Sequence, residues 1–157
     1  MTEVAFIVHG KIRRMERLKA RLAGAMPAGF EPAFSETQHA GHATELTQQA
    51  LAGGAKYVIA VGGDGLLNEV ANGYMNSSDD IRKQAVLGVF PQGTGNDFCK
   101  TVGIRADVQQ LSGLLQHNSV KPADICHIRF RDVNHSPAER YFINIADIGI
   151  GGYVSQR

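Results

Sequence analysis

The sequence predicts an α/β fold: a parallel sheet flanked by helices, followed by the start of a second, β-rich unit. A short buried strand runs into a glycine-rich turn and then a helix at residues 57–73, and the same order recurs at 85–98. Strands that alternate with helices form parallel sheets with right-handed crossovers, with a ligand crevice at the carboxyl ends of the strands. The β-rich unit is predicted because helical periodicity stops near Asn118.

The composition is that of an ordinary globular domain. Of 157 residues, 43% are hydrophobic and 20% are charged, and the net charge of +1 argues against a nucleic-acid partner. Cys99 and Cys126 are too few and too far apart for a disulfide framework, so a reducing cytoplasm is expected. The N-terminus lacks the basic flank of a signal peptide, and no stretch approaches the roughly 20 apolar residues that span a bilayer. Any lipid would therefore be met through transient contact with the membrane surface.

In the first half of the chain, strands and helices alternate. The predicted elements are a strand at 4–9, a helix through Ile12 and Leu22, a weak strand at 30–35, a polar loop at 37–41 and a helix at 42–52. The first helix carries arginines and lysines on its polar side. This basic face could attract an anionic lipid or a nucleotide, although a solvated helix face is the favoured interpretation.

The second half continues this alternation and then changes character. The predicted elements are a strand at 57–61, a helix from Leu66, a polar loop at 75–83, a strand at 85–90, a helical start at Phe98 and an amphipathic helix at 107–117. Two extended segments follow, at 120–130 and 140–150, joined by a polar turn at 134–137. We therefore divide the chain into an α/β domain at 1–119 and the start of an incomplete β-rich domain at 120–157. Exposed apolar faces on that β-rich part could also drive formation of a homodimer.

The two glycine turns supply an inventory for binding phosphate. Gly62 to Gly65 and Gly93 to Gly95 offer bare backbone N–H groups beside helix N-termini, and Thr94 adds a hydroxyl. Asp64 would repel a phosphate unless a cation lay between them, and Asp64 with Asp97 can hold Mg²⁺ through its waters. Phosphoryl transfer needs this combination of positioning and charge neutralisation.

Two further acidic residues have an alternative explanation. Asp124 is a candidate for the same network, but it could equally serve a turn or a cap after Pro122. Glu69 lies in the helix after Gly65, where a solvated surface or a favourable interaction with the helix dipole would explain it as well. The common nucleotide signatures GxxxxGK[ST] and a complete GxGxxG after a strand are missing from the sequence.

GGDGLLNEVANG followed by PQGTGNDF resembles the catalytic domain of the diacylglycerol kinase and sphingosine kinase family of lipid kinases, which is related to NAD kinases and phosphofructokinases. The resemblance extends to Thr37 with His42 and Ala43, to Asp124, to Phe142, Ile143 and Asn144, and to Gly149. It implies a Rossmann-like first domain, a β-sandwich second domain that is truncated here, and ATP bound in the crevice between them.

The resemblance also implies roles for individual residues. Gly62, Gly63, Gly65, Gly93, Thr94 and Gly95 would contact the phosphates of ATP, with Thr37 and Glu69 at the edge of the nucleotide site. Asp64, Asp97 and Asp124 would form a network linked to Mg²⁺. Asp64 is the candidate catalytic base that takes the proton of the lipid hydroxyl, unless a carboxylate of the second domain does so.

The sequence departs from the family pattern at two places. The first strand of the family ends in an Asn-Pro-x-Ser-Gly-like loop, where this chain has His9-Gly10-Lys11 and Lys11 would supply the positive charge. Leu66 replaces the common Thr, as in sphingosine kinases, which does not by itself identify the acceptor. The expected function is ATP-dependent phosphorylation of diacylglycerol or a related lipid. The alternatives are an NAD kinase-like enzyme and a nucleotide-binding module that is inactive without the rest of the second domain.

Overall fold

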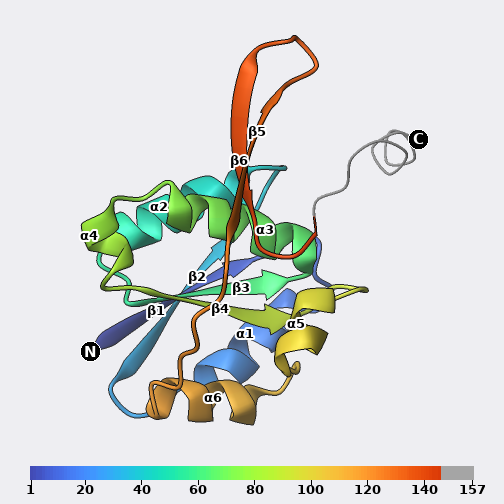
Figure 1. The fold of residues 1–157 in the computed structure, drawn as a ribbon. Helices are drawn as coiled ribbons and strands as arrows, with labels where there is room; N and C mark the ends of the chain where they lie inside the picture. The colour runs from blue at the N-terminus through green and yellow to red at the C-terminus, as the bar shows by residue number, and fades with distance from the viewer. Residues whose placement is uncertain (146–157) are drawn as a thin grey trace.

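The computed structural model describes residues 1–145, and a four-stranded parallel sheet with helices on both faces forms its body (Figure 1). The strands are β1 (Thr2–Val8), β2 (Phe30–Glu36), β3 (Tyr57–Gly62) and β4 (Val86–Pro91), in the order β2-β1-β3-β4. All three neighbouring pairs are parallel. The predicted α/β class with a parallel sheet is therefore confirmed.

The helices that follow the strands cover the sheet from two sides. They are α1 (Met15–Gly24), α2 (His42–Ala52), α3 (Asp64–Met75), α4 (Asp79–Arg82), α5 (Asp97–Val102) and α6 (Val108–Gln116). Helices α2 and α3 pack on one face through Leu51, Leu67 and Val70, whereas α1 and α6 pack on the other through Leu22 and Leu115. Every residue of β3 is buried, as expected for a central strand covered on both faces.

The predicted polar loop at residues 75–83 is wrong. Helix α3 continues through Met75, and α4 forms a further helical turn. Two side chains stabilise this region: the Arg82 guanidinium donates to the carbonyls of Met75 and Ser77 and pairs with Asp79, while the Tyr74 hydroxyl donates to the Arg82 carbonyl over 2.8 Å. Local composition favoured a loop, but these contacts with the preceding helix hold the turn in helical form.

A two-stranded antiparallel hairpin follows the sheet domain; its turn projects away from that domain, while the end of β6 contacts α3 (Figure 1). Its strands are β5 (Cys126–Arg131) and β6 (Pro137–Phe142). The predicted limits are wrong, because residues 120–125 form no strand, whereas β6 starts at Pro137, inside the predicted turn, and ends at Phe142. Asp132 closes the turn by accepting the N–H groups of Asn134 and Ser136, both over 2.9 Å. Residues 146–150 of the second predicted segment, with Gly149, lie outside the described residues. The division of the chain near residue 119 stays a prediction.

Within residues 1–145, no helix combines the length and the apolar character needed to cross a bilayer.

Candidate functional site

The first glycine turn leads from β3 into α3 with little room for a side chain at Gly62 and Gly63. A Cβ atom on Gly62 would stand 2.7 Å from Cδ2 of Leu66, so a larger residue would collide with the first turn of the helix. Gly63 is the N-cap residue, with extended backbone, and its carbonyl accepts the N–H of Leu67 over 3.1 Å. Asp64 is then the first residue of α3, at the end of the helix where N–H groups lack intrahelical partners.

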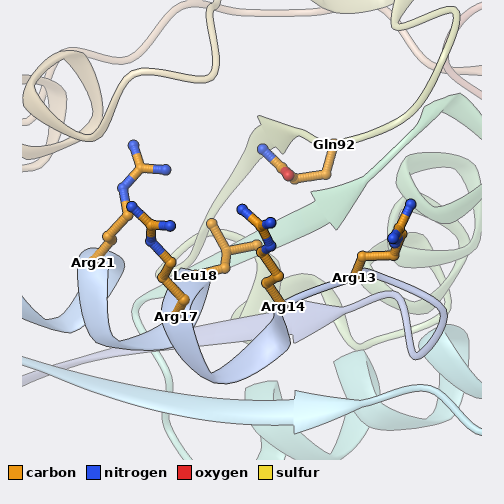
Figure 2. Close-up of a pocket in the computed structure, with 6 residues that line it drawn as sticks. All are labelled: Arg13, Arg14, Arg17, Leu18, Arg21 and Gln92. Atoms are coloured by element: carbon orange, nitrogen blue, oxygen red, sulfur yellow. The ribbon is translucent and has the colours of Figure 1, made fainter.

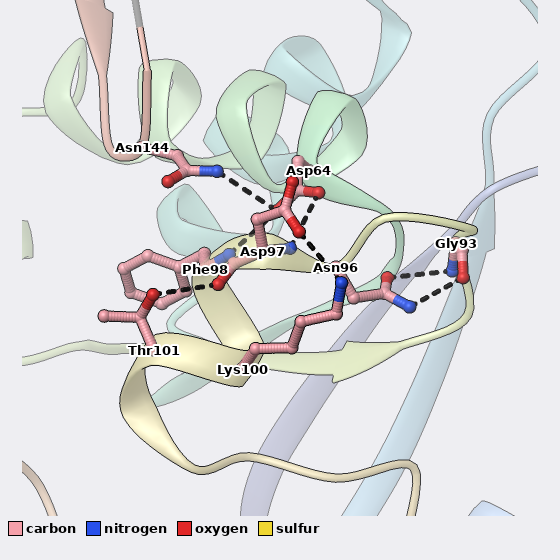
Figure 3. Close-up of polar contacts among 8 residues, drawn as sticks. All are labelled: Asp64, Gly93, Asn96, Asp97, Phe98, Lys100, Thr101 and Asn144. Carbon is pink, nitrogen blue, oxygen red and sulfur yellow. Dashed lines mark hydrogen bonds and ion pairs between the residues drawn. The ribbon is translucent and has the colours of Figure 1, made fainter.

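Asn96 closes the second glycine turn, which leads from β4 into α5 (Figure 3). Its side-chain amide accepts the N–H of Gly93 over 3.0 Å and donates to the Gly93 carbonyl over 2.6 Å. Asn96 itself has φ 54°, a left-handed conformation that asparagine adopts more readily than most residues. Asn96 is not among the residues predicted for the site, although an asparagine two residues before the predicted helix start at Phe98 was an available signal.

The two glycine turns touch each other. A Cβ atom on Gly93 would stand 2.4 Å from the Cα of Gly63, and one on Gly63 would stand 3.1 Å from the Cα of Gly93. This approach is possible because β3 and β4 are adjacent parallel strands whose carboxyl ends meet at one edge of the sheet. The Gln92 N–H strengthens the junction by donating to the Gly62 carbonyl over 2.8 Å.

Asp64 joins the two turns by capping the helix that follows the second one. Its Oδ2 accepts the N–H of Asp97 over 3.1 Å, and its Oδ1 accepts the N–H of Phe98 over 3.2 Å (Figure 3). The N-cap residue Asn96 makes no side-chain cap of its own, so Asp64 satisfies these donors from across the site. The amide Nδ2 of Asn144 lies 3.5 Å from the same Oδ1 atom, bringing the end of the hairpin to this carboxylate.

Asp64 and Asp97 border the small space that a side chain on Gly95 would occupy. A Cβ atom on Gly95 would lie 3.3 Å from Oδ2 of Asp64 and 3.5 Å from Oδ2 of Asp97. The other oxygen of Asp97 pairs with the Lys100 ammonium over 3.0 Å. Two carboxylates with oxygens directed into one space are a donor set that suits Mg²⁺, which commonly takes one or two protein carboxylates and completes its shell with water or phosphate.

The structure does not bring Asp124 into this group. Asp124 is exposed, in the segment between α6 and β5, and it makes no hydrogen bond or ion pair with the residues that the structure describes. Across residues 1–145, no three histidine, cysteine or acidic side chains gather in a way that could hold a metal ion. The three carboxylates predicted from the sequence therefore do not form one cluster, because Asp124 lies on the connection to the hairpin and not at a strand end of the sheet.

Thr37 and Glu69 anchor the segments around the site. The Thr37 hydroxyl accepts the Gly10 N–H over 3.1 Å, and a Cβ atom on Gly10 would stand only 2.0 Å from the Thr37 carbonyl oxygen. The Glu69 carboxylate accepts the Ala43 N–H over 3.2 Å and so caps the start of α2 from the neighbouring helix. These contacts give both residues a structural task. The sequence allows Thr37 a cap of the helix at 42–52, but its hydroxyl accepts the Gly10 N–H instead.

A cleft of about 580 Å³ opens beside the touching turns. It is lined by His9, Lys11, Ile12, Arg13, Gly62, Gly63, Gly65, Leu66, Gln92 and Gly93. Four of the predicted phosphate contacts are among them, whereas Thr94 and Gly95 are exposed and lie outside its wall. Lys11 and Arg13 place positive charge opposite the glycine turns, where it would complement a polyphosphate.

A second hollow, of about 190 Å³, continues from this cleft along α1 (Figure 2). The two cavities share Arg13 and Gln92 in their linings. The second is lined by Arg13, Arg14, Arg17, Leu18, Arg21 and Gln92. Figure 2 shows the arginine side chains extending from α1 and the segment before it toward the same side as Gln92. None of them has an acidic partner within 4.0 Å among residues 1–145, whereas Lys19 pairs with Glu16 and Glu36. The sequence analysis favoured a plain solvated face, because periodicity alone does not show that these charges line one hollow.

Cys99 lies in the core next to the site. Burial, together with the negative charge of Asp64, raises the pKa of its thiol from 9.0 to about 11, so the group is protonated at neutral pH. Cys99 is thus a buried apolar contact and not a nucleophile. Both Cys99 and the exposed Cys126 are free.

Comparison with known proteins identifies relatives over nearly the whole chain. The model of the family described as diacylglycerol kinase catalytic domain matches residues 4–128. A protein of Pseudomonas aeruginosa PAO1 named "Probable lipid kinase YegS-like" is 31% identical over 153 residues, which is 98% of this chain and 46% of that protein. The protein of Bacillus subtilis 168 named "Diacylglycerol kinase" is 33% identical over 150 residues, 92% of this chain and 45% of that protein.

Solved structures agree with this assignment. A crystal structure of a diacylglycerol kinase from Bacillus anthracis Sterne matches with a TM-score of 0.62 and 26% identity, over 81% of this chain and 46% of that chain. This chain therefore spans about half the length of the relatives it matches. On the family match and on these relatives, the chain belongs to the diacylglycerol kinase catalytic domain family.

Proposed function

We propose that this chain is the nucleotide-binding half of an ATP-dependent lipid kinase, which transfers the γ-phosphoryl group to the hydroxyl of diacylglycerol or a related lipid. The observation that carries the proposal is the contact between the two glycine turns at adjacent strand ends, with Asp64 bonded across them. Membership of the diacylglycerol kinase catalytic domain family supports it. Phosphoryl transfer is catalysed mainly by positioning and by electrostatic stabilisation, and this arrangement offers both.

The polyphosphate of ATP would lie in the cleft beside the turns. Gly62, Gly63, Gly65 and Gly93 present backbone rather than side chains there, so N–H groups can approach the phosphate oxygens closely. Thr94, Gly95 and the loop at Thr37 would contact the nucleotide from the margin. Asp64 and Asp97 would hold Mg²⁺, which supplies positive charge between the carboxylates and the phosphates. This removes the repulsion that an acidic residue in a phosphate-binding turn would otherwise cause.

Asp64 is also the candidate for the general base. An ionised carboxylate has about four lone-pair sites, and backbone N–H groups of α5 occupy two of them. The remaining sites can accept the proton of the lipid hydroxyl as its oxygen attacks the γ-phosphorus and the bond to the β–γ bridging oxygen breaks, with ADP as the leaving group. The two N–H bonds fix the carboxylate in place, which is what a base at this position needs.

Asp64→Asn in the full-length protein tests this assignment. An amide oxygen can still accept an α5 N–H, so the fold is expected to survive, while transfer of ³²P from ATP to lipid should fall by a factor of about 10² or more. Asp79→Asn, the same change at a carboxylate in the α4 ion pair, is the matched control and should leave turnover unchanged. Undiminished transfer by Asp64→Asn would remove Asp64 from the mechanism.

The phase in which the labelled product appears, organic or aqueous, identifies the acceptor. Incubation with diacylglycerol in mixed micelles is expected to give label in the organic phase. Label that appears only in the aqueous phase, with NAD as the acceptor, would instead establish the NAD kinase-like alternative.

These 157 residues by themselves are expected to bind MgATP with little turnover, because the chain covers less than half of its relatives' length. Calorimetry with MgATP beside a turnover assay would separate binding from catalysis. Full-rate transfer by this chain would show that the site is complete without further residues.

The arginine-lined hollow is the part of this chain best suited to contact a membrane surface. Its four guanidinium groups lack acidic partners among the described residues, and each basic residue near an anionic bilayer contributes about 1 kcal/mol. Replacing both Arg17 and Arg21 by Gln should therefore weaken the affinity for phosphatidylglycerol vesicles roughly 30-fold, as measured by co-sedimentation. Lys83→Gln, which removes an exposed cation elsewhere, is the control. Equal binding to neutral phosphatidylcholine vesicles would count against an electrostatic contact.

We place this contact at the cytoplasmic face, which the two free cysteines support.

The hairpin is our candidate for a homodimer interface, because Phe130 is 44% exposed and Val133 is 89% exposed. Light scattering over a concentration series should show self-association that weakens in Phe130→Ser.

A further inference from the structure

Asn72 is unusual among the buried polar side chains. Residues 1–145 hold two such side chains, Thr47 and Asn72, of which Asn72 is 7% exposed. The Thr47 hydroxyl donates to the Ala43 carbonyl one turn earlier in its own helix, as buried helical threonines commonly do. Asn72 instead directs its amide to β6, where Nδ2 donates to the Tyr141 carbonyl over 2.8 Å and Oδ1 accepts the Tyr141 N–H over 2.9 Å.

The Asn72 side-chain amide makes the two backbone hydrogen bonds with Tyr141 that a neighbouring strand would otherwise make. The N–H and C=O of one residue in a strand point to the same edge, and at Tyr141 that edge faces α3 and not the partner strand β5. Edge groups of this kind are otherwise left for water or for another chain. Asn72 satisfies both, and its second amide hydrogen goes to the Asn68 carbonyl over 2.8 Å, which orients the side chain along its own helix.

The bonded strand leads directly to Asp64. Asn144 follows Tyr141 by three residues, and its Nδ2 lies 3.5 Å from Oδ1 of Asp64. Asp64 and Asn72 are eight residues apart in α3, a rise of about 12 Å. Three residues of chain reach at most about 10–11 Å, and the chain bends at residues 143 and 144, so the side chains of Asn144 and Asp64 cover the rest of this span. A slip of one residue along β6 would displace Asn144 by about 3.3 Å and remove its contact with Asp64.

We propose that Asn72 is a positioning residue of the phosphoryl-transfer site: by holding the backbone of Tyr141, it sets the distance between Asn144 and the Asp64 carboxylate. The inference rests on the proposed function, because it gives Asn72 a part in the same reaction. At 3.5 Å the Asn144 contact is at the outer limit of a hydrogen bond, so a small shift of β6 is enough to break it.

Asn72→Gln in the full-length enzyme is the test. Glutamine keeps the amide and can still bond Tyr141, but its extra methylene moves the strand by about 1 Å, a displacement that commonly costs a factor of about 10² in kcat. The expected result is a fall in kcat of that order with the KM for ATP little changed, while overpacking lowers the melting temperature but leaves the protein folded at the assay temperature. Thr47→Val, the control at the other buried polar side chain, should alter stability and leave kcat unchanged. A loss of activity in Asn72→Gln that merely follows the folded fraction would overturn the proposal.

A double-mutant cycle with Asn144→Ala tests whether Asn72 acts through Asn144. If it does, the double variant should be no slower than the slower single variant, because both changes remove one contact. Independent, multiplicative losses in kcat would contradict the proposal.

Hydrogen exchange provides a measurement that does not depend on kinase activity. The Tyr141 amide is expected to exchange slowly in the wild type and much faster in Asn72→Ala; equal rates would refute the contact. If the wild type phosphorylates no acceptor, the proposed function fails, while exchange at Tyr141 still decides whether Asn72 holds β6.

Discussion

Gly93→Ala is the most direct test of how the two glycine turns are packed. The structure places a Cβ atom at this position 2.4 Å from the Cα of Gly63, 3.0 Å from its nitrogen and 2.9 Å from Oδ1 of Asn96. Two of these neighbours are backbone atoms, which cannot rotate away. Since carbon atoms pack at about 3.5–4.0 Å, the turns must separate by roughly 1 Å or more to admit the methyl group.

Two magnitudes follow from this separation. Overpacking of this kind costs about 1–3 kcal/mol of folding free energy. Its effect on function should be of similar size, because a misplacement of about 1 Å at a site of phosphoryl transfer can lower turnover by a factor of about 10², or about 2.7 kcal/mol. The Asn96 bonds to Gly93 would also be disturbed, and with them the N-terminus of α5 that Asp64 caps.

Urea unfolding, MgATP titration and turnover of the full-length protein measure these effects. Gly113→Ala in α6 is the matched control, since a Cβ atom there meets nothing within 4 Å. The same substitution in a helix interior should stabilise the protein by about 0.5–1 kcal/mol and leave turnover unchanged. If Gly93→Ala unfolds at the wild-type urea concentration and binds MgATP with wild-type affinity, the two turns are not in contact as described.

Three further outcomes are expected. Asp107→Ala should cost about 1 kcal/mol in urea unfolding, because Asp107 caps α6 by accepting the N–H groups of Gln109 and Gln110. Iodoacetamide at pH 8 should label the exposed Cys126 and spare the buried Cys99 in the native protein, whereas both should react in urea, as peptide mass spectrometry would show. Because the pKa of Cys99 is raised from 9.0 to about 11 on folding, the unfolded thiol loses its proton first, and stability should fall as pH rises through that window. Cys99→Ala should reduce this decline in melting temperature.

Much of the fold could be predicted because its signals are local. The apolar runs of β1 and β3 predict strands covered on both faces, and the glycines that follow mark the places where the chain turns at the sheet edge. Parallel strands joined by helices then require both turns to lie at the same edge. The neighbouring positions of Gly63 and Gly93 follow from this rule, although their direct contact does not.

The wrong predictions arose where contacts with other elements override the local composition. Residues 75–83 are polar and carry no strong helical periodicity, so composition predicts a loop, while Arg82 and Tyr74 hold the helical turn through contacts that composition does not reveal. The first hairpin strand was predicted to start at residue 120, but it starts at Cys126, since pairing with β6 and not β-propensity sets its limit.

The sequence by itself therefore determined the parallel sheet, the two glycine turns and the family, because each depends on residues that are close together in the chain. Only the tertiary structure decided what the polar side chains of the site hold. Asp64 caps a helix that begins 33 residues later, Glu69 caps the helix before it, and Asn72 bonds a strand 69 residues away. Such bonds form between elements that meet only after the sheet has assembled, so the spacing of residues along the chain does not predict them.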